Sequence, residues 1–235
     1  MNNATKTEVI GLEDSNVICE DLEDFPLEVF GAVGANLAST PIICGGEIYN
    51  GSSKDSSDKC FKYMEGGWQH FATMIERRAS AAGIVYNNAL HIFGGQDNAK
   101  ELQSSEIVKE DGSVTEGPHL PTPIWDHAIA SINSTVSVMT GGFINGFPSN
   151  QTWYFNHTSQ EFQPGPNLLK SRYLHSSGSV TDQKTKEKMI IIAGGVSSEF
   201  GILKSTEILL NDEWKKGKTH TESYICLFLY TFKLD

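Results

Sequence analysis

Four double glycines recur along the chain at a nearly constant spacing, and no other sequence feature constrains the fold as strongly. The pairs are Gly45-Gly46, Gly94-Gly95, Gly141-Gly142 and Gly194-Gly195. Their first members lie 49, 47 and 53 residues apart, and each pair follows a short apolar run: PIIC, LHIF, VSVMT and MIIIA. A period of roughly 50 residues is typical of architectures that repeat one supersecondary unit. The chain is therefore expected to be an array of four such units.

Each unit contains further runs at matching distances from its glycine pair. The third run reads KCFKYM, SSEIVK, TWYFN or STEILL, and the hydrophobic position after it is Trp68, Val114, Phe162 or Trp214. With the strand that precedes the apolar run, this gives four short strands joined by Asn, Gly and Pro turns. A strand that ends against a crowded neighbour needs glycine there, because glycine has no Cβ and takes positive φ. Four-stranded units of this length predict radial blades.

The double glycine after an apolar strand, the Tyr position that follows (Tyr63, Tyr154) and the tryptophan beyond it (Trp68, Trp214) together resemble the kelch repeat. The resemblance covers about residues 7–216, although the second and third units have Val114 and Phe162 in place of tryptophan. It implies an all-β fold, a kelch-type β-propeller of about four to five four-stranded blades. Because kelch propellers usually close with more blades than this, it also implies a possibly incomplete circle.

The two ends of the chain depart from the repeat. Residues 1–27 are expected to form a half blade, residues 28–217 four kelch repeats, and residues 218–235 an atypical tail. The apolar segment 223–234 is expected to supply one or two strands to a blade that the N-terminal half blade completes. Open sheet edges invite pairing with other chains. The alternative is a fragment or variant product that begins or ends within the propeller, and such a chain is expected to be less stable or to oligomerise.

The charge balance restricts the class of partner. With 18 basic and 29 acidic residues the net charge is −11, which repels nucleic acid and anionic membrane surfaces. The longest apolar run, residues 224–232, is about half the length needed to span a bilayer. The first residues contain neither the basic nor the apolar region of a secretory signal, so the chain as written is expected to be cytoplasmic.

Cysteines and glycosylation sequons favour the opposite compartment. Cys44 and Cys60 fall on adjacent strands of the first unit, where they form either a disulfide or two small buried hydrophobic contacts. Five Asn-x-Ser/Thr sequons begin at Asn3, Asn50, Asn133, Asn150 and Asn156, several of them in predicted loops. Both features favour an extracellular origin, which an incomplete N-terminus would explain.

The candidate partner-binding residues lie just before the first strands of the second, third and fourth units, at the position that lines one end of the central channel in kelch domains that hold peptides. They are Arg77, Arg78, Trp125, Asp126, His127, Arg172, Tyr173 and His175. An arginine pair holds an acidic motif by bidentate contacts. The alternative interpretation is structural: Arg77 and Arg78 bond loop carbonyls, and the two histidines bond a neighbouring blade.

No reaction centre is predicted. The serines form no nucleophile elbow, the glycine pairs open no helix that would bind phosphate, and the histidines and cysteines have no metal-ligand spacing. The expected function is a non-catalytic interaction module that binds a protein partner, without cofactor or metal. Two alternatives are the substrate-recognition part of a cullin-type ubiquitin ligase adaptor and a secreted binding protein.

Overall fold

The computed structural model describes residues 8–10, 19–21, 23–49, 51, 53–181 and 186–219. All regular secondary structure within these residues is β-strand. The search for membrane spans over the same residues finds no helix that is long and apolar enough to cross a bilayer. The all-β prediction is therefore confirmed for the described part of the chain.

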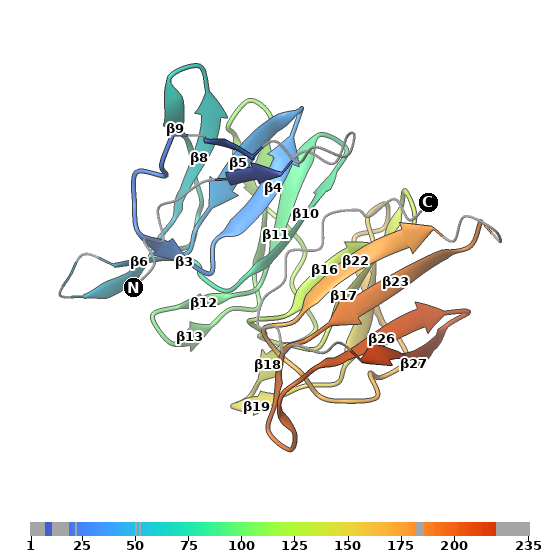
Figure 1. Cartoon of the computed structure of the whole chain (residues 1–235). Coiled ribbons are helices and arrows are strands. Elements are labelled where there is room, and N and C mark those ends of the chain that lie inside the picture. The colour runs from blue at the N-terminus through green and yellow to red at the C-terminus, as the bar shows by residue number, and fades with distance from the viewer. Residues whose placement is uncertain are drawn as a thin grey trace.

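Four antiparallel sheets of four strands follow one another along the described chain, from blue to red in Figure 1. We call them blades 1 to 4. Blade 1 contains β4 (Val33–Leu37), β5 (Thr40–Cys44), β8 (Lys59–Met64) and β9 (Gly67–Thr73). Blade 2 contains β10 (Ala82–Tyr86), β11 (Ala89–Phe93), β14 (Ser105–Lys109) and β15 (Val114–Glu116). Blade 3 contains β16 (Ala128–Ser131), β17 (Val136–Thr140), β20 (Thr152–Asn156) and β21 (Glu161–Pro164). Blade 4 contains β22 (Ser176–Thr181), β23 (Lys188–Ala193), β26 (Ser205–Leu210) and β27 (Glu213–Thr219).

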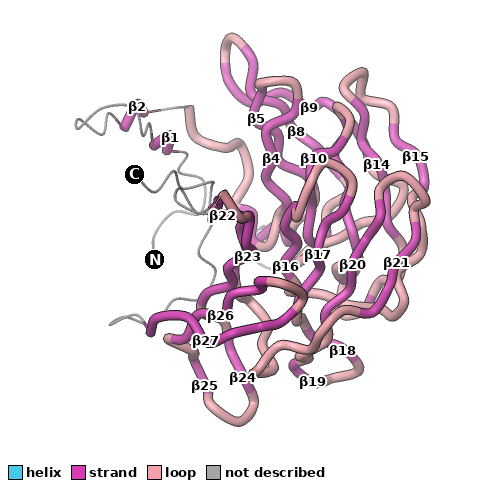
Figure 2. The backbone as a smooth tube through the Cα atoms, turned by 90° about the vertical axis from the view of Figure 1, so that its right-hand side faces the viewer, coloured by secondary structure: helices cyan, strands magenta, loops and turns pink. Residues whose placement is uncertain are grey.

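The blades are arranged like those of a propeller. The first strands lie next to one another, β4 beside β10, β10 beside β16 and β16 beside β22, and the later strands lie outward from them (Figure 2). Within the described residues no sheet joins blade 4 back to blade 1. The architecture is thus a propeller-like row of four blades.

Small sheets sit at one end of the blades, between the second and third strands. They are β12 (Gln96–Asp97) with β13 (Lys100–Glu101), β18 (Phe143–Ile144) with β19 (Phe147–Pro148), and β24 (Val196–Ser197) with β25 (Gly201–Ile202). In blade 1 the corresponding sheet contains β3 (Val29–Phe30), β6 (Glu47–Tyr49) and β7 (Lys54–Ser56). We call this the hairpin end. The opposite end, where tight turns join the first strand to the second in blades 1 to 3 and the third to the fourth in all four blades, is the turn end.

The N-terminal strands pair only with each other among the described strands. β1 (Glu8–Ile10) and β2 (Cys19–Asp21) form a two-stranded antiparallel sheet in which Glu8 lies opposite Asp21. Residues 220–235 lie outside the described residues, and the segment 223–234 is among them. That this segment and the N-terminal strands complete one blade stays a prediction.

The glycine pairs are the joints between successive blades. The amide of the second glycine donates to a carbonyl in the loop that precedes the next blade, Gly46 to Arg78, Gly95 to Ile124 and Gly142 to Arg172, each at 2.8 Å. A Cβ on the first glycine of the same three pairs would lie 2.3 to 2.4 Å from that carbonyl oxygen. All eight glycines have positive φ. The backbones therefore meet too closely for any side chain.

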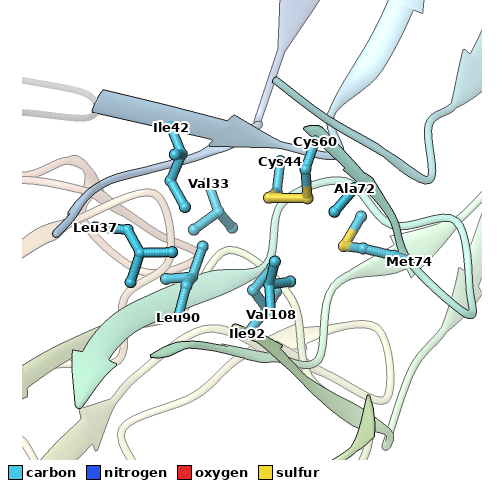
Figure 3. Packing of buried hydrophobic residues seen from close by; sticks show 10 residues of the cluster. All are labelled: Val33, Leu37, Ile42, Cys44, Cys60, Ala72, Met74, Leu90, Ile92 and Val108. Carbon is cyan, nitrogen blue, oxygen red and sulfur yellow. A yellow bond between two sulfur atoms is a disulfide. The ribbon is translucent and has the colours of Figure 1, made fainter. Parts of the chain in front are cut away.

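Three clusters of buried side chains lie between successive blades of the described chain. Figure 3 shows the cluster between blades 1 and 2, where Val33, Leu37 and Ile42 face Leu90 and Ile92. The clusters fill the space between sheets because the inner strands bury side chains against the neighbouring blade, most completely in β11, whose five residues are all buried. Packing between blades therefore holds the row together.

The first cluster contains a disulfide. Cys44 and Cys60 are register partners on β5 and β8, with Cα atoms 4.0 Å apart, and their sulfurs are bonded (Figure 3). Of the two interpretations of this cysteine pair, the structure has the disulfide.

The two tryptophans differ in burial. Trp214 is buried between blades 3 and 4, whereas Trp68 is half-buried and packs edge-on against Phe25.

Candidate functional site

The four first strands line a cavity of about 970 Å³. Many of the lining residues are small or polar, among them Gly34, Gly83, Ser131, Ser177 and Gly178. These residues leave space between the first strands, and a Cβ added to Gly34 would meet no atom within 4 Å. The cavity is a channel that begins at the hairpin end, where the loops preceding the blades reach it.

Four residues form the channel mouth: Gly31, Ser80, Asp126 and Leu174. Each lies two residues before the first strand of its blade. Backbone hydrogen bonds connect the four residues in chain order: Ser80 N–H to Gly31 O at 2.7 Å, Asp126 N–H to Ser80 O at 2.8 Å, and Leu174 N–H to Asp126 O at 3.0 Å. All four have φ between +50° and +63°. Non-glycine residues seldom adopt this conformation, so the three that do are held by the hydrogen bonds between blades.

Asp126 is the acidic group of the channel mouth. Burial raises its pKa to about 6, although a hydrogen bond from the Ser80 side chain acts in the opposite direction, and the charge of Glu47 raises it further. A carboxylate desolvated in this way is stabilised by an approaching cation. The mouth therefore favours a positively charged group.

An aromatic patch lies beside the mouth and consists of Trp125, Phe143 and Tyr173. Ring centroids of Trp125 and Phe143 are 4.7 Å apart, and those of Phe143 and Tyr173 are 5.1 Å apart. Trp125 and Tyr173 precede the mouth residues Asp126 and Leu174, and each forms a β-bridge to a small hairpin. All three rings are half-exposed. The nearby tip of the β18–β19 hairpin presents Phe147, which is 71% exposed.

The structure corrects the prediction that Arg78 and Arg172 bind a partner. The two side chains are only 1% and 0% exposed. Arg78 donates to the carbonyls of Gly94 (2.7 Å) and Ser104 (3.3 Å), to the Ser104 hydroxyl (3.2 Å) and to Glu106 (2.6 Å). The two terminal nitrogens of each guanidinium are bonded within the blade, and the Nε atoms of both arginines are buried without a hydrogen-bond partner, so neither group is presented to an outside ligand. Their role is the structural alternative, carbonyl bonding, with a buried carboxylate added.

Arg172 repeats the same arrangement in blade 4. It donates to the carbonyls of Gly194 (2.8 Å) and Ser205 (3.2 Å), to the Ser205 hydroxyl (3.2 Å) and to Glu207 (2.6 Å). Glu207 accepts in addition the backbone N–H groups of Leu169 and Lys170, as Glu106 does those of Ile75 and Glu76. Each pair thus fastens the loop before a blade to the third strand of that blade.

The histidines and Arg77 divide between the two interpretations. The ring of His175 shares a 2.9 Å hydrogen bond with Thr140 of blade 3, which is the neighbouring-blade bond of the structural interpretation. His127 is buried beside Gly94 and Gly142, and burial lowers its pKa to about 3. Both histidines are buried, but they line the cavity between the first strands, so a role for them in binding stays a prediction. Arg77 is exposed.

Several residues of these arrangements were absent from the sequence prediction. Glu106 and Glu207 stand in the same repeat position as one another, which was a usable signal, but their separation from the arginines, 28 and 35 residues, hides the pairing. Phe143 comes from a hairpin that has no signature in the repeat. His91 and His157, which follow no repeat phase, meet between blades 2 and 3 with ring centroids 5.6 Å apart. The described residues contain no group of three or more His, Cys, Asp or Glu that could hold a metal ion.

Comparison with known proteins places the fold but no family. No family model matches the chain. Over 124 residues, 52% of this chain, it is 25% identical to the spermatocyte protein spe-26 of Caenorhabditis elegans, and the match spans only 21% of that protein's length. The solved structure of YjhT superimposes with a TM-score of 0.81 over 93% of this chain and 79% of YjhT, at 12% sequence identity. The last comparison shows a shared fold.

Proposed function

We propose that this chain is a non-catalytic protein–protein interaction module, a kelch-type propeller that binds a protein partner at the channel mouth and the aromatic patch. The observation that carries the proposal is the group of half-exposed rings of Trp125, Phe143 and Tyr173 next to the desolvated carboxyl of Asp126. Tryptophan and tyrosine are enriched among the residues that dominate binding energy at protein interfaces. The rigid blades hold these groups on loops, where binding residues are commonly placed.

The chemistry of the mouth indicates the chemistry of the partner. The net charge of −11 and the half-buried carboxyl of Asp126 favour a partner that presents lysine or arginine. The aromatic patch favours an apolar side chain beside that positive group. We therefore expect the bound segment to combine an apolar residue with a basic one.

The disulfide favours a secreted binding protein over a ubiquitin ligase adaptor as the form of this proposal. Cys44 and Cys60 are bonded within the core between blades 1 and 2. Structural disulfides persist in oxidising compartments and are rare in the cytosol. A secreted binding protein is the version that this observation favours, whereas the ubiquitin ligase adaptor rests on the kelch resemblance alone.

A phage-displayed library of random peptides tests the proposal on the purified chain. The selected peptides are expected to share an apolar residue next to lysine or arginine. Trp125→Ala and Tyr173→Ala are each expected to weaken the best peptide by about 30-fold, the effect of losing a residue worth about 2 kcal/mol at an interface.

The matched control is Met64→Ala, because Met64 is 50% exposed but is the last residue of β8, next to the turn at the opposite end of blade 1. Its peptide affinity is expected to equal that of the unmodified chain. Melting temperatures of all variants show whether each one folds. Selected peptides whose binding responds to Met64→Ala, or fails to respond to both aromatic substitutions, would refute the proposed site.

A further inference from the structure

Two of the Asn-x-Ser/Thr sequons lie side by side at the turn end of blade 3. Asn133 is in the turn between β16 and β17, and Asn156 begins the turn between β20 and β21. Val136, the residue to which the first turn leads, is the register partner of Asn156. Partners of this kind have Cα atoms roughly 4.5 to 5.5 Å apart. The two sequons therefore occupy adjacent turns of one blade.

Both asparagines are exposed, and local hydrogen bonds fix the orientation of their amides. Asn133 Oδ1 accepts the backbone N–H groups of Thr135 and Val136, both at 2.8 Å, and the Thr135 hydroxyl at 3.1 Å. Asn156 Oδ1 accepts the N–H groups of Thr158 (2.8 Å) and Ser159 (3.2 Å). An amide oxygen accepts hydrogen bonds from backbone N–H groups, whereas the amide nitrogen only donates, so the atom that faces these N–H groups is Oδ1 and the remaining atom of each side-chain amide is Nδ2. Neither Nδ2 donates a hydrogen bond to any described residue.

Asn150 provides a contrast within the same blade. Its sequon is Asn150-Gln151-Thr152, yet its Nδ2 donates to the carbonyl of Leu168 at 3.4 Å, and its side chain is only half-exposed. The sequon threonine, Thr152, is 2% exposed. A sugar on this nitrogen would have to fit beside Leu168, which is itself buried. The folded blade therefore accepts a glycan at two of its three sequons.

We propose that Asn133 and Asn156 are N-glycosylation sites, and that they place two neighbouring glycans at the turn end of blade 3. In the transfer step the Asn Nδ2 forms a bond to the anomeric carbon of a lipid-diphosphate-linked oligosaccharide. The bond from that carbon to the phosphate oxygen breaks, the lipid diphosphate leaves with the electron pair, and Nδ2 loses one proton to a base of the transferase. The sequon marks a surface loop of a secreted protein, which agrees with the Cys44–Cys60 disulfide.

This placement leaves the binding site uncovered. The channel mouth and the aromatic patch lie at the hairpin end, whereas both glycans would project from the opposite end of the blades. The proposal stands independently of the function proposed above, since it concerns different residues and its test involves no partner.

The test expresses the full chain behind a secretion signal in eukaryotic cells. The secreted protein is treated with peptide N-glycosidase in ¹⁸O-labelled water, which converts each glycosylated asparagine to labelled aspartate, and peptides are mapped by mass spectrometry. Label is expected at Asn133 and Asn156 and not at Asn150. Absence of label at either of the first two sites, or label at Asn150 in the folded secreted protein, overturns the proposal.

Matched variants separate loss of the sequon from loss of folding. Thr135→Ala and Thr158→Ala each remove one sequon and are expected to remove one step of the glycosidase shift on a gel. Thr135→Ser and Thr158→Ser change the same two turns but keep the sequons, so they are expected to retain both steps. A serine variant that loses its step although the protein is secreted would contradict the assignment.

Discussion

Replacing Arg172 by methionine tests whether the buried arginines hold the blades or bind a partner. The substitution keeps most of the volume of the side chain but removes its charge and all four hydrogen bonds to Gly194, Ser205 and Glu207. Glu207, which is 2% exposed, then remains as a buried carboxylate without its counterion. If the arginine instead serves a ligand, binding changes and stability does not.

The expected magnitude follows from the contacts that remain. Removing one partner of a buried ion pair costs about 3 to 5 kcal/mol, because the other charge is left uncompensated. Glu207 keeps the backbone N–H groups of Leu169 and Lys170, so the lower part of this range, about 3 kcal/mol, is expected. For a chain of this length 1 kcal/mol corresponds to about 2 to 4 °C, so the melting temperature is expected to fall by about 6 to 12 °C.

Blade 3 shows that the charged pair is replaceable as a unit. Ile124 occupies in the loop before blade 3 the position that Arg172 occupies before blade 4. Its carbonyl accepts from Gly95, the second glycine of the preceding pair, as that of Arg172 accepts from Gly142. The Ile124 side chain packs in one cluster with Trp153 of β20. The double variant Arg172→Met/Glu207→Leu is therefore expected to be more stable than the sum of the two single losses predicts, since it leaves no charge unpaired.

Urea denaturation of the wild type, both single variants and the double variant measures this coupling. A conservative control in blade 3, Ile124→Val, is expected to cost only about 0.5 to 1.5 kcal/mol. The reasoning is refuted if Arg172→Met unfolds within about 0.5 kcal/mol of the wild type, or if the two single losses simply add. Should Arg172→Met not fold at all, Glu207→Gln, which preserves shape, gives the same comparison.

Three further predictions concern single groups. Gly141→Ala is expected to lower the free energy of unfolding by about 2 to 5 kcal/mol, because its Cβ would meet the Arg172 carbonyl oxygen at 2.4 Å. Gly146→Ala, also at positive φ but in open space, is expected to lower it by only about 1 to 2 kcal/mol. Urea denaturation measures both losses. Reducing the Cys44–Cys60 disulfide, which closes a short loop, is expected to lower the free energy of unfolding by about 3 kcal/mol, and an unchanged melting temperature after reduction would contradict this. The pKa of Asp126 is raised to about 6 in the folded chain, so the protonated carboxyl contributes to folding stability below the unfolded pKa near 4, and this contribution is lost as the pH rises through 6. Asp126→Asn is therefore expected to shift the urea midpoint upward more at about pH 8 than at about pH 5. Equal shifts at the two pH values would contradict the assignment.

Local patterns in the sequence predicted the repeat and its turns. One of the predicted asparagine turns is Asn87-Asn88, which joins β10 to β11. Both residues have positive φ, a conformation that asparagine tolerates. The glycine pairs were predicted from the same kind of information, a residue type required by a backbone conformation. The disulfide was left open, since spacing places two cysteines on adjacent strands but does not fix their register.

The candidate site depended on contacts that span tens of residues. Arg77 and Arg78 are adjacent in the chain, yet Arg77 is exposed and Arg78 is buried. The difference arises because β14 brings Glu106 within hydrogen-bond distance of Arg78. The aromatic patch is likewise assembled from two loops and a hairpin of blades 3 and 4. No local pattern encodes such a meeting.

The sequence by itself determined the four-stranded unit, the number of complete units and the glycine joints, because each depends on backbone conformation and hydrophobic spacing within about 50 residues. Only the tertiary structure decided which side chains at the loops face solvent. Burial is a property of the packed blades: a polar side chain is buried when a partner from another strand satisfies its hydrogen bonds, and that partner is fixed by strand register rather than by its distance along the chain. The double glycines bond the loop before the next blade, and in these loops the packed blades bury Arg78 and Arg172 while Arg77 stays exposed.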